Sequence, residues 1–225
     1  MVKRLFDIAL TALALVACIP ILIVAALGIR LSSRGPVLYR ATRAGRRGRL
    51  FVMYKLRTME QRPELLADSV ITGAHDPRVF PFGALLRRSK LDELPQLFNV
   101  LRGDMAVVGP RPEDPKVVAQ HYTPEQWETL DVAPGLTSPG ALYSTTHGEN
   151  WLSTRDAERD YFEHLLPLKL ALDRVYVRNA SLAYDLGVIV RTLGVVIGRV
   201  FGRRRFAEPP EMHEARRLLT PAVAQ

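Results

Sequence analysis

The sequence predicts a mainly helical α+β protein, with an N-terminal re-entrant membrane helix, a small β-hairpin and interfacial amphipathic helices around one compact catalytic domain. Three features support this class: an apolar run at 8–29, two strand-forming runs on either side of a turn at 45–48, and a long apolar segment at 181–201. Of 225 residues, 48% are hydrophobic, which is enough to bury a core. The single cysteine, Cys18, excludes an intramolecular disulfide and a cysteine zinc cluster.

The first element is an apolar segment long enough to cross a bilayer. From Ile8 to Ile29 every residue is apolar or small apart from Thr11, and about 20 such residues suffice for a hydrocarbon core of about 30 Å. One interpretation is a cleaved signal, because Leu-Val-Ala-Cys at 15–18 resembles a lipoprotein cleavage box. However, the apolar run continues for eleven positions past Cys18, whereas a signal is followed by a polar mature start. We therefore expect a retained membrane helix.

Pro20, near the middle of this segment, predicts a bend. Proline removes one backbone donor and clashes with the preceding turn of a helix. The bent segment either spans the membrane with a kink or enters and leaves by the same face, and the sequence leaves both open. Basic residues flank both ends, at 3–4 and 30–34, and cationic flanks tend to stay in the cytoplasm. We favour a re-entrant helix over residues 1–34.

The next element is a β-hairpin at 37–58. The strand-forming runs at 37–39 and 50–54 flank Gly-Arg-Arg-Gly, a turn sequence. The formal net charge of +8 is concentrated here, with nine basic residues and no acid between Arg30 and Arg57. A solvated basic face is the simple interpretation. Because the block directly follows the apolar segment, we favour an anionic membrane surface over nucleic acid as its partner.

The remaining elements follow from local patterns. Apolar residues at i, i+3, i+4 and i+7 predict a helix at 94–101, and Gly-Pro-Arg-Pro at 109–112 predicts a rigid extended turn. The segment 181–201, bordered by arginines, suits either a core helix or a helix in the membrane interface. The other expected elements are a helix or loop at 82–88, an extended segment at 105–108, a short helix at 124–130, a loop at 134–148, and helices at 155–166 and 169–178. We expect the catalytic domain to cover 35–205 and a peripheral tail to cover 206–225.

The most informative stretch is residues 89–112, which read SKLDELPQLFNVLRGDMAVVGPRP. The adjacent acids Asp92 and Glu93 precede Pro95, and proline is well tolerated in the first turn of a helix. We therefore expect this acid pair at or near a helix N-terminus. Two neighbouring carboxylates can hold Mg²⁺, and one can attack phosphorus to form an acyl-phosphate. The simpler alternative is a charged helix start, which composition alone favours.

Several cationic side chains near the acid pair are suited to phosphate. Guanidinium groups bind phosphate oxygens through two parallel hydrogen bonds. Each such residue alone is an ordinary surface residue, except the arginine at 111, whose flanking prolines fix its backbone. The sequence contains no glycine-rich nucleotide-binding loop, and its five histidines lack the spacing of a metal site. The candidates are Lys55, Arg57, Arg87, Arg88 and Arg111.

At these residues the chain resembles the bacterial sugar transferase family of polyprenyl-phosphate phosphoglycosyl transferases, in its small monotopic form. The resemblance covers about residues 3 to 193, and its motifs are specific in combination. They are KRLFD at 3–7, the proline-broken apolar run, GPVLYRATRAG and GRLFVMYKLRTM within 35–59, DPR at 76–78, LDELPQLFNVLRGDM at 91–105, VGPRP at 108–112, PGLT at 134–137 and YVRNASLAYDL at 176–186.

The resemblance implies an enzyme on the cytoplasmic face of the bacterial inner membrane that moves a sugar 1-phosphate from a nucleotide sugar, expected to be a UDP-sugar, to undecaprenyl phosphate. It implies that Asp92 is the nucleophile, that Glu93 joins it in binding Mg²⁺, and that Pro20 breaks the re-entrant helix. The basic positions implied to hold phosphate are Lys55, Arg57, Arg88 and Arg111. The expected partners are these two substrates and membrane lipid, without nucleic acid. The alternatives are a non-catalytic scaffold on anionic lipid and a lipoprotein acylated at Cys18.

Overall fold

The computed structural model describes residues 1–60, 76–148 and 157–219. Helices dominate, and the strands form two separate two-stranded sheets, so the mainly helical α+β class is confirmed. In chain order the elements are α1 Val2–Ser32, β1 Leu38–Ala44, η1 Arg46–Gly48, β2 Leu50–Leu56, α2 Pro81–Arg88, η3 Leu91–Glu93, α3 Gln96–Arg102, β3 Ala106–Val108, α4 Pro115–His121, η4 Pro124–Leu130, β4 Gly135–Thr137, α5 Pro139–His147, α7 Ala157–Asp160, η5 Tyr161–Leu165, α8 Leu166–Asn179, α9 Leu182–Val200 and α10 Met212–Leu219.

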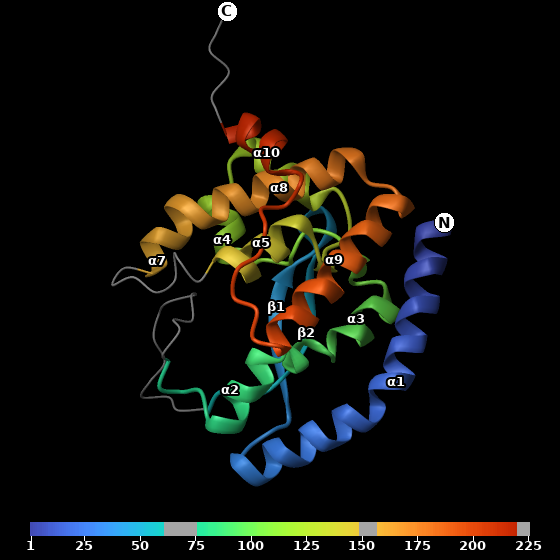
Figure 1. Ribbon diagram of the computed structural model, residues 1–225, viewed down its shortest axis with the longest axis vertical. Helices are drawn as coiled ribbons and strands as arrows, with labels where there is room; N and C mark the ends of the chain where they lie inside the picture. The colour runs from blue at the N-terminus through green and yellow to red at the C-terminus, as the bar shows by residue number, and fades with distance from the viewer. Residues whose placement is uncertain (61–75, 149–156, 220–225) are drawn as a thin grey trace, which may run out of the picture.

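The helix α1 lies along the outside of the molecule. It contains Pro20, and Figure 1 shows it bend between an upper half beside α3 and a lower half that runs below α2. Such a bend is what a proline within a helix produces. Only 11% of the most apolar 18-residue window of α1 is buried within the protein. By length and composition α1 could therefore lie in a membrane, with most of its apolar side chains directed outward.

Polar side chains in the first turns of α1 fasten it to the domain. The Lys3 ammonium lies 2.6 Å from a carboxylate oxygen of Asp185 in α9. Arg4 donates to the carbonyls of Val100 and Leu101 in the last turn of α3, at 2.5 and 2.9 Å, which places a cation at the negative end of that helix. The buried carboxylate of Asp7 accepts from a backbone N–H of β3 at 3.4 Å. The motif at 3–7 thus joins α1 to three elements distant in sequence.

Two glycines allow close packing around α2. A Cβ atom on Gly28 of α1 would lie 2.4 Å from the ring of Phe82. A Cβ atom on Gly83 would lie 2.2 Å from the backbone oxygen of Thr58, which follows β2. Both approaches are too short for any side chain. The glycines therefore bring α2, the lower half of α1 and the end of the hairpin together.

The predicted β-hairpin is confirmed. Strands β1 and β2 pair antiparallel from Leu38 opposite Leu56 to Ala44 opposite Leu50. The connecting turn is the predicted Gly-Arg-Arg-Gly segment, in which Arg47 has a φ of 56° and the next glycine a φ of 73°. The hairpin extends from this turn to the acid pair.

The expected loop at 134–148 is wrong, because this segment contains β4 and α5. Strand β4 pairs with β3 in parallel, where Gly109 and Gly135 approach so closely that a Cβ atom on either would clash with the other strand or its neighbours. The Ser138 side chain accepts from the N–H of Ala141, and Pro139 is the first residue of α5. The serine and proline that suggested a loop are therefore the helix start signal.

The largest core cluster surrounds α8. Leu165, Leu170 and Leu172 are at most 1% exposed, and α5 and α10 pack on either side of α8. The described part of the expected helices at 155–166 and 169–178 forms one continuous helical run, α7–η5–α8. The tail expected to be peripheral also contributes, because Met212 and Ala215 of α10 are buried in this cluster. Their spacing places both side chains on one face of α10, which packs on α8.

Candidate functional site

The acid pair lies in the 3₁₀ turn η3, directly before α3. Lys90 precedes this turn in the left-handed conformation, with φ 59° and ψ 13°, and Pro95 is the N-cap residue of α3. The prediction that the pair lies near a helix start is confirmed. The turn gives the two acids different surroundings, because Asp92 is only 7% exposed while Glu93 faces the cations of neighbouring segments.

Glu93 is bound by two cations from different parts of the chain. Arg111, held between two prolines, donates to both carboxylate oxygens, at 3.2 and 2.6 Å. The Lys55 ammonium, near the end of β2, lies 3.3 Å from Oε1. Burial raises the pKa of Glu93, but Arg111 and then Lys55 outweigh it and hold the pKa well below its ordinary value. Glu93 is therefore an ionised acid that fixes the two cations in place.

Asp92 has no comparable partner. Its Oδ1 is buried and accepts no hydrogen bond from any described residue. Burial and then the negative charge of Glu93 raise the pKa of Asp92, although Lys55, Lys90 and Arg87 oppose the rise. A carboxylate that is desolvated and unpaired is more reactive than one held in ion pairs. The two adjacent acids thus have opposite electrostatic surroundings.

The other predicted phosphate-binding residues are not all brought to this turn. Arg57 is 3% exposed and donates to Ser33 and to the carbonyl of Pro36, so it ties the end of α1 to the hairpin. Arg88 is exposed at the end of α2. Its neighbour Arg87 instead points inward, where Nε donates to the Thr58 hydroxyl at 2.9 Å.

Arg87 is therefore the arginine of α2 whose charge acts on Asp92. Burial lowers its pKa, while the charge of Asp92 is the largest influence that raises it. The sequence offered both arginines as candidates, and the family resemblance implied Arg88 rather than Arg87. The packing of α2 determines which arginine points inward. Leu86 is buried, and Arg87 beside it turns toward the hairpin.

A second set of buried charges lies behind Arg111 and was missed from the sequence. Glu113 forms an ion pair with Lys169 of α8, whose side chain is 3% exposed. The Tyr161 hydroxyl lies 3.4 Å from the same carboxylate oxygen. The charge of Glu113 also acts on Arg111, so positive and negative groups alternate from Lys55 to Lys169. Lys169 lies between Leu168 and Leu170, and this local pattern gave no signal of an ion pair.

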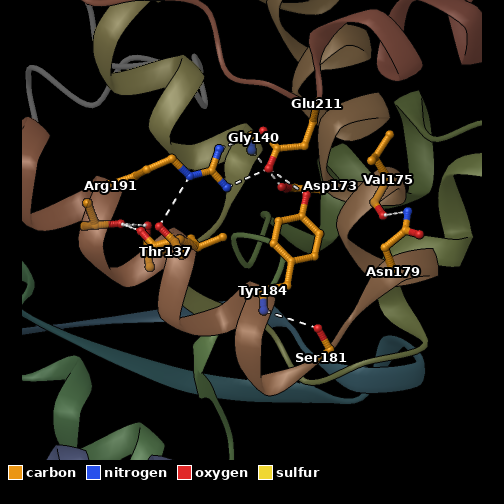
Figure 2. A network of polar contacts seen from close by, with 12 residues as sticks. Thr137, Gly140, Asp173, Val175, Asn179, Ser181, Tyr184, Arg191 and Glu211 are labelled. Carbon is orange, nitrogen blue, oxygen red and sulfur yellow. Dashed lines mark hydrogen bonds and ion pairs between the residues drawn. The ribbon is translucent and has the colours of Figure 1, made fainter.

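Polar contacts also fix the helices beside the site (Figure 2). The hydroxyl of Thr137, in β4, lies 2.7 Å from that of Thr192 in α9. Glu211, beyond α9, accepts from Arg191 at 2.8 and 2.6 Å and from the Tyr184 hydroxyl at 2.6 Å. These bonds hold α9 against β4 on one side and against the segment leading to α10 on the other.

The donor set of the acid pair fits Mg²⁺. Among the described residues no group of three or more histidine, cysteine or acidic side chains gathers as a complete metal site. Mg²⁺ does not need one, since it is usually held by one or two carboxylates and completed by waters and substrate phosphates. The unpartnered oxygen of Asp92 is such a donor. Glu93, whose oxygens are already bound by cations, offers the second carboxylate beside it.

Comparison with known proteins places this geometry in a family. The model of the bacterial sugar transferase family matches residues 1–199. The undecaprenyl-phosphate glucose phosphotransferase of Komagataeibacter xylinus is 38% identical over 209 residues, which are 91% of this chain and 37% of that protein. The UDP-glucose:undecaprenyl-phosphate glucose-1-phosphate transferase of Caulobacter vibrioides is 38% identical over 194 residues, 85% of this chain and 68% of that protein.

A third relative carries a different sugar in its name. The undecaprenyl-phosphate galactose phosphotransferase of Salmonella typhimurium is 34% identical over 214 residues, which are 88% of this chain and 40% of that protein. The chain thus spans well under half the length of two of these three relatives. The family model nevertheless covers the described acid pair, its cations and nearly all of α9. The chain therefore belongs to the bacterial sugar transferase family.

Proposed function

We propose that this protein is a phosphoglycosyl transferase that moves a sugar 1-phosphate from a UDP-sugar to undecaprenyl phosphate. The observation that carries the proposal is the contrast within the acid pair: Asp92 is buried and its Oδ1 has no hydrogen-bond partner among the residues that the structure describes, while Glu93 is bound by Arg111 and Lys55. The named substrates of the relatives supply the substrate class. Because those names include both glucose and galactose, the proposal extends to a hexose and not to a particular sugar.

The reaction proceeds in two displacements. A carboxylate oxygen of Asp92 attacks the phosphorus that bears the sugar, a P–O bond forms, and the bond to the other phosphate breaks with release of UMP. An oxygen of undecaprenyl phosphate then attacks the same phosphorus and displaces Asp92. The products are undecaprenyl diphosphate sugar and the free carboxylate. A raised pKa makes Asp92 a better nucleophile when it is ionised.

The remaining groups of the site bind and orient the phosphates. Arg111 and Lys55, already held by Glu93, offer preorganised positive charge to the transferred phosphate. Mg²⁺ held by Asp92 and Glu93 would neutralise charge on the leaving phosphate when bound. Arg87 adds a third cation from α2. Arg88 and Arg57 stay predictions, and the contacts of Arg57 favour a role in joining α1 to the hairpin.

We further propose that the domain rests on the cytoplasmic face of the inner membrane. The two halves of α1 would enter and leave the membrane by that same face, because the helix bends in its middle. Helix α9 would lie in the interface, because its exposed side includes apolar residues spaced along one face and its end meets three arginines. The exposed apolar residues are Leu186, Val190, Leu193, Ile197, Val200 and Phe201. In this placement the acid pair would have to lie at the depth of a polyprenyl head group.

The test measures UMP release by the full chain in lipid nanodiscs, with Mg²⁺, a panel of UDP-sugars and undecaprenyl phosphate. Replacing a nucleophile that acts as part of a unit commonly costs at least about a thousandfold in rate, so we expect Asp92→Asn to be nearly inactive. Asp131→Asn is the matched control, since Asp131 is exposed in the bend after η4. Normal turnover by Asp92→Asn would refute the mechanism.

The covalent intermediate has its own measurement. Incubation with the UDP-sugar alone, without acceptor, is expected to add the mass of one sugar phosphate to the wild-type chain and nothing to Asp92→Asn. Intact-mass spectrometry after acid quenching reads this adduct. A wild-type protein that binds anionic vesicles but releases no UMP from any UDP-sugar would instead favour the non-catalytic scaffold.

A further inference from the structure

Lys90 holds an unusual backbone conformation at the entrance to the acid pair. With φ 59° and ψ 13° it is one of two non-glycine residues of positive φ in the described ranges, and the other lies in the hairpin turn. Glycine adopts this region freely, and asparagine more readily than most residues. The backbone conformation alone would therefore favour glycine or asparagine over lysine at position 90. Residues kept in such conformations cluster at functional sites.

The Lys90 side chain is also the uncommitted cation of this site. It is exposed, and within the described residues its ammonium makes no hydrogen bond and no ion pair. Lys55 and Arg111 are both bound to Glu93. Arg87 is bound to a hydroxyl and a thioether sulfur at the end of the hairpin. Of these cations, Lys90 alone can turn toward an arriving anion without first leaving a partner.

The charge of Lys90 reaches both acids. Burial and then Glu93 raise the pKa of Asp92, and Lys90 is among the cations that oppose this rise, after Lys55. Lys90 also helps Arg111 and Lys55 lower the pKa of Glu93 against the effect of burial. The positive charge of Lys90 therefore acts on both carboxylates at which we propose that the transfer occurs. Lys90 is the N-cap residue of η3, only two residues before Asp92.

We propose that Lys90 binds a substrate phosphate at the acid pair, an inference that rests on the proposed function. Two substrates carry such a group: the diphosphate of the nucleotide sugar and the phosphate head group of the polyprenyl acceptor. A lysine ammonium is a compact charge on a flexible stem, so it can follow a phosphate without the fixed geometry of an arginine. The stem starts at the residue that directly precedes η3, the turn that carries both acids.

A purely conformational role for position 90 is the competing explanation, and substitutions separate the two. Lys90→Gly and Lys90→Asn both suit the left-handed conformation and remove the charge. Lys90→Arg keeps the charge and the strain. If phosphate binding is the role, the two neutral variants lose function together while Lys90→Arg retains most of it. If the conformation alone matters, the neutral variants behave like the wild type.

The experiment follows each half of the reaction with full-length protein in nanodiscs. One arm measures the burst of UMP against UDP-sugar concentration without acceptor, and the other measures the steady rate against undecaprenyl phosphate concentration. We expect Lys90→Asn and Lys90→Gly to raise the half-saturating concentration of one substrate by about fivefold to tenfold, as for an exposed charged hydrogen bond. Thermal melts are expected to be unchanged or raised. The arm that shifts identifies the phosphate.

The outcomes are distinct. Wild-type half-saturation in both arms for both neutral variants would overturn the role of Lys90 while leaving the proposed function intact. A loss in Lys90→Arg equal to that in Lys90→Asn would also overturn it, because the charge would then not be the cause. A wild-type protein that releases no UMP would refute the proposed function, and this inference with it.

Discussion

Arg111 binds both carboxylate oxygens of Glu93, at 3.2 and 2.6 Å. This pairing engages Glu93, whereas the buried Oδ1 of Asp92, one residue earlier, accepts no hydrogen bond within the described part of the chain. Two neighbouring carboxylates of similar sequence context thereby differ in chemistry. Part of this difference comes from Arg111 and Lys55, which lie 18 and 38 residues from Glu93 along the chain.

Arg111→Lys tests the importance of the two-oxygen contact. A lysine keeps the charge but cannot reproduce the planar fork, so Glu93 and the phosphate would both be held less precisely. We expect kcat/KM for the UDP-sugar to fall by about 10-fold to 100-fold, the range for loss of one preorganised contact. Steady-state UMP release measures this. Arg216→Lys, in an exposed ion pair with Glu208, is the control, and an equal loss there would contradict the explanation.

The raised pKa of Asp92 predicts a pH-dependent effect on stability. Burial and then Glu93 raise this pKa above its ordinary value of 3.8, so the ionised form is the disfavoured one in the folded protein. Asp92→Asn removes that cost, and we expect the variant to melt at a higher temperature than the wild type near neutral pH. The difference should shrink as pH falls through the folded-state pKa and vanish below the unfolded value. Thermal melts across this range measure it, and a difference independent of pH would contradict the assignment.

The buried pair of Glu113 and Lys169 predicts a strong single-site effect and a weaker double one. Lys169→Met leaves Glu113 buried without its cation, and breaking a buried pair in this way typically costs about 3–5 kcal/mol. Replacing both, as Glu113→Gln with Lys169→Met, leaves no isolated charge and should recover most of that loss. Chemical denaturation of the solubilised protein measures both variants. A double variant no more stable than Lys169→Met would show that the pair is not the source of the effect.

Gly83 and Gly187 are both helical glycines, but replacing them with alanine is expected to change the stability of the protein in opposite directions. A Cβ atom on Gly83 would lie 2.2 Å from the Thr58 backbone oxygen, whereas one on Gly187 would have no neighbour within 4 Å among the described residues. Overpacking typically costs about 1–3 kcal/mol, so Gly83→Ala should lower the free energy of unfolding. Gly187→Ala should raise it by about 0.5–1 kcal/mol through better helix propensity. Equal effects of the two substitutions would refute the packing explanation.

Local sequence patterns predicted the elements whose signals are local. The hairpin at 37–58 follows from strand-forming residues around a turn, and the start of α3 follows from Pro95 after two acids. The prediction of a loop at 134–148 was wrong because the same residues, Ser138 and Pro139, are typical of both loops and helix starts. Strand β4 has only three residues, too few for an alternating pattern to be recognised.

The sequence predicted the acids of the site and two of their cations, but not the inward arginine of α2 or the ion pair of Lys169. Asp92, Glu93, Lys55 and Arg111 are brought together as expected. The choice between neighbouring arginines of α2 depends on which face of that helix is buried, and the ion pair of Lys169 depends on contacts 56 residues apart. Such relations are set by packing, so no short window of sequence contains them.

The hydrogen bonds of Arg4 have a mechanical consequence for the acid pair. Arg4 donates to carbonyls in the last turn of α3, and the acid pair lies just before the first turn of the same helix. Seven residues of helix make a rigid strut of about 10 Å. We expect a tilt or shift of α1 to be transmitted along α3, so that the position of the Asp92 carboxylate depends on how the outer helix packs.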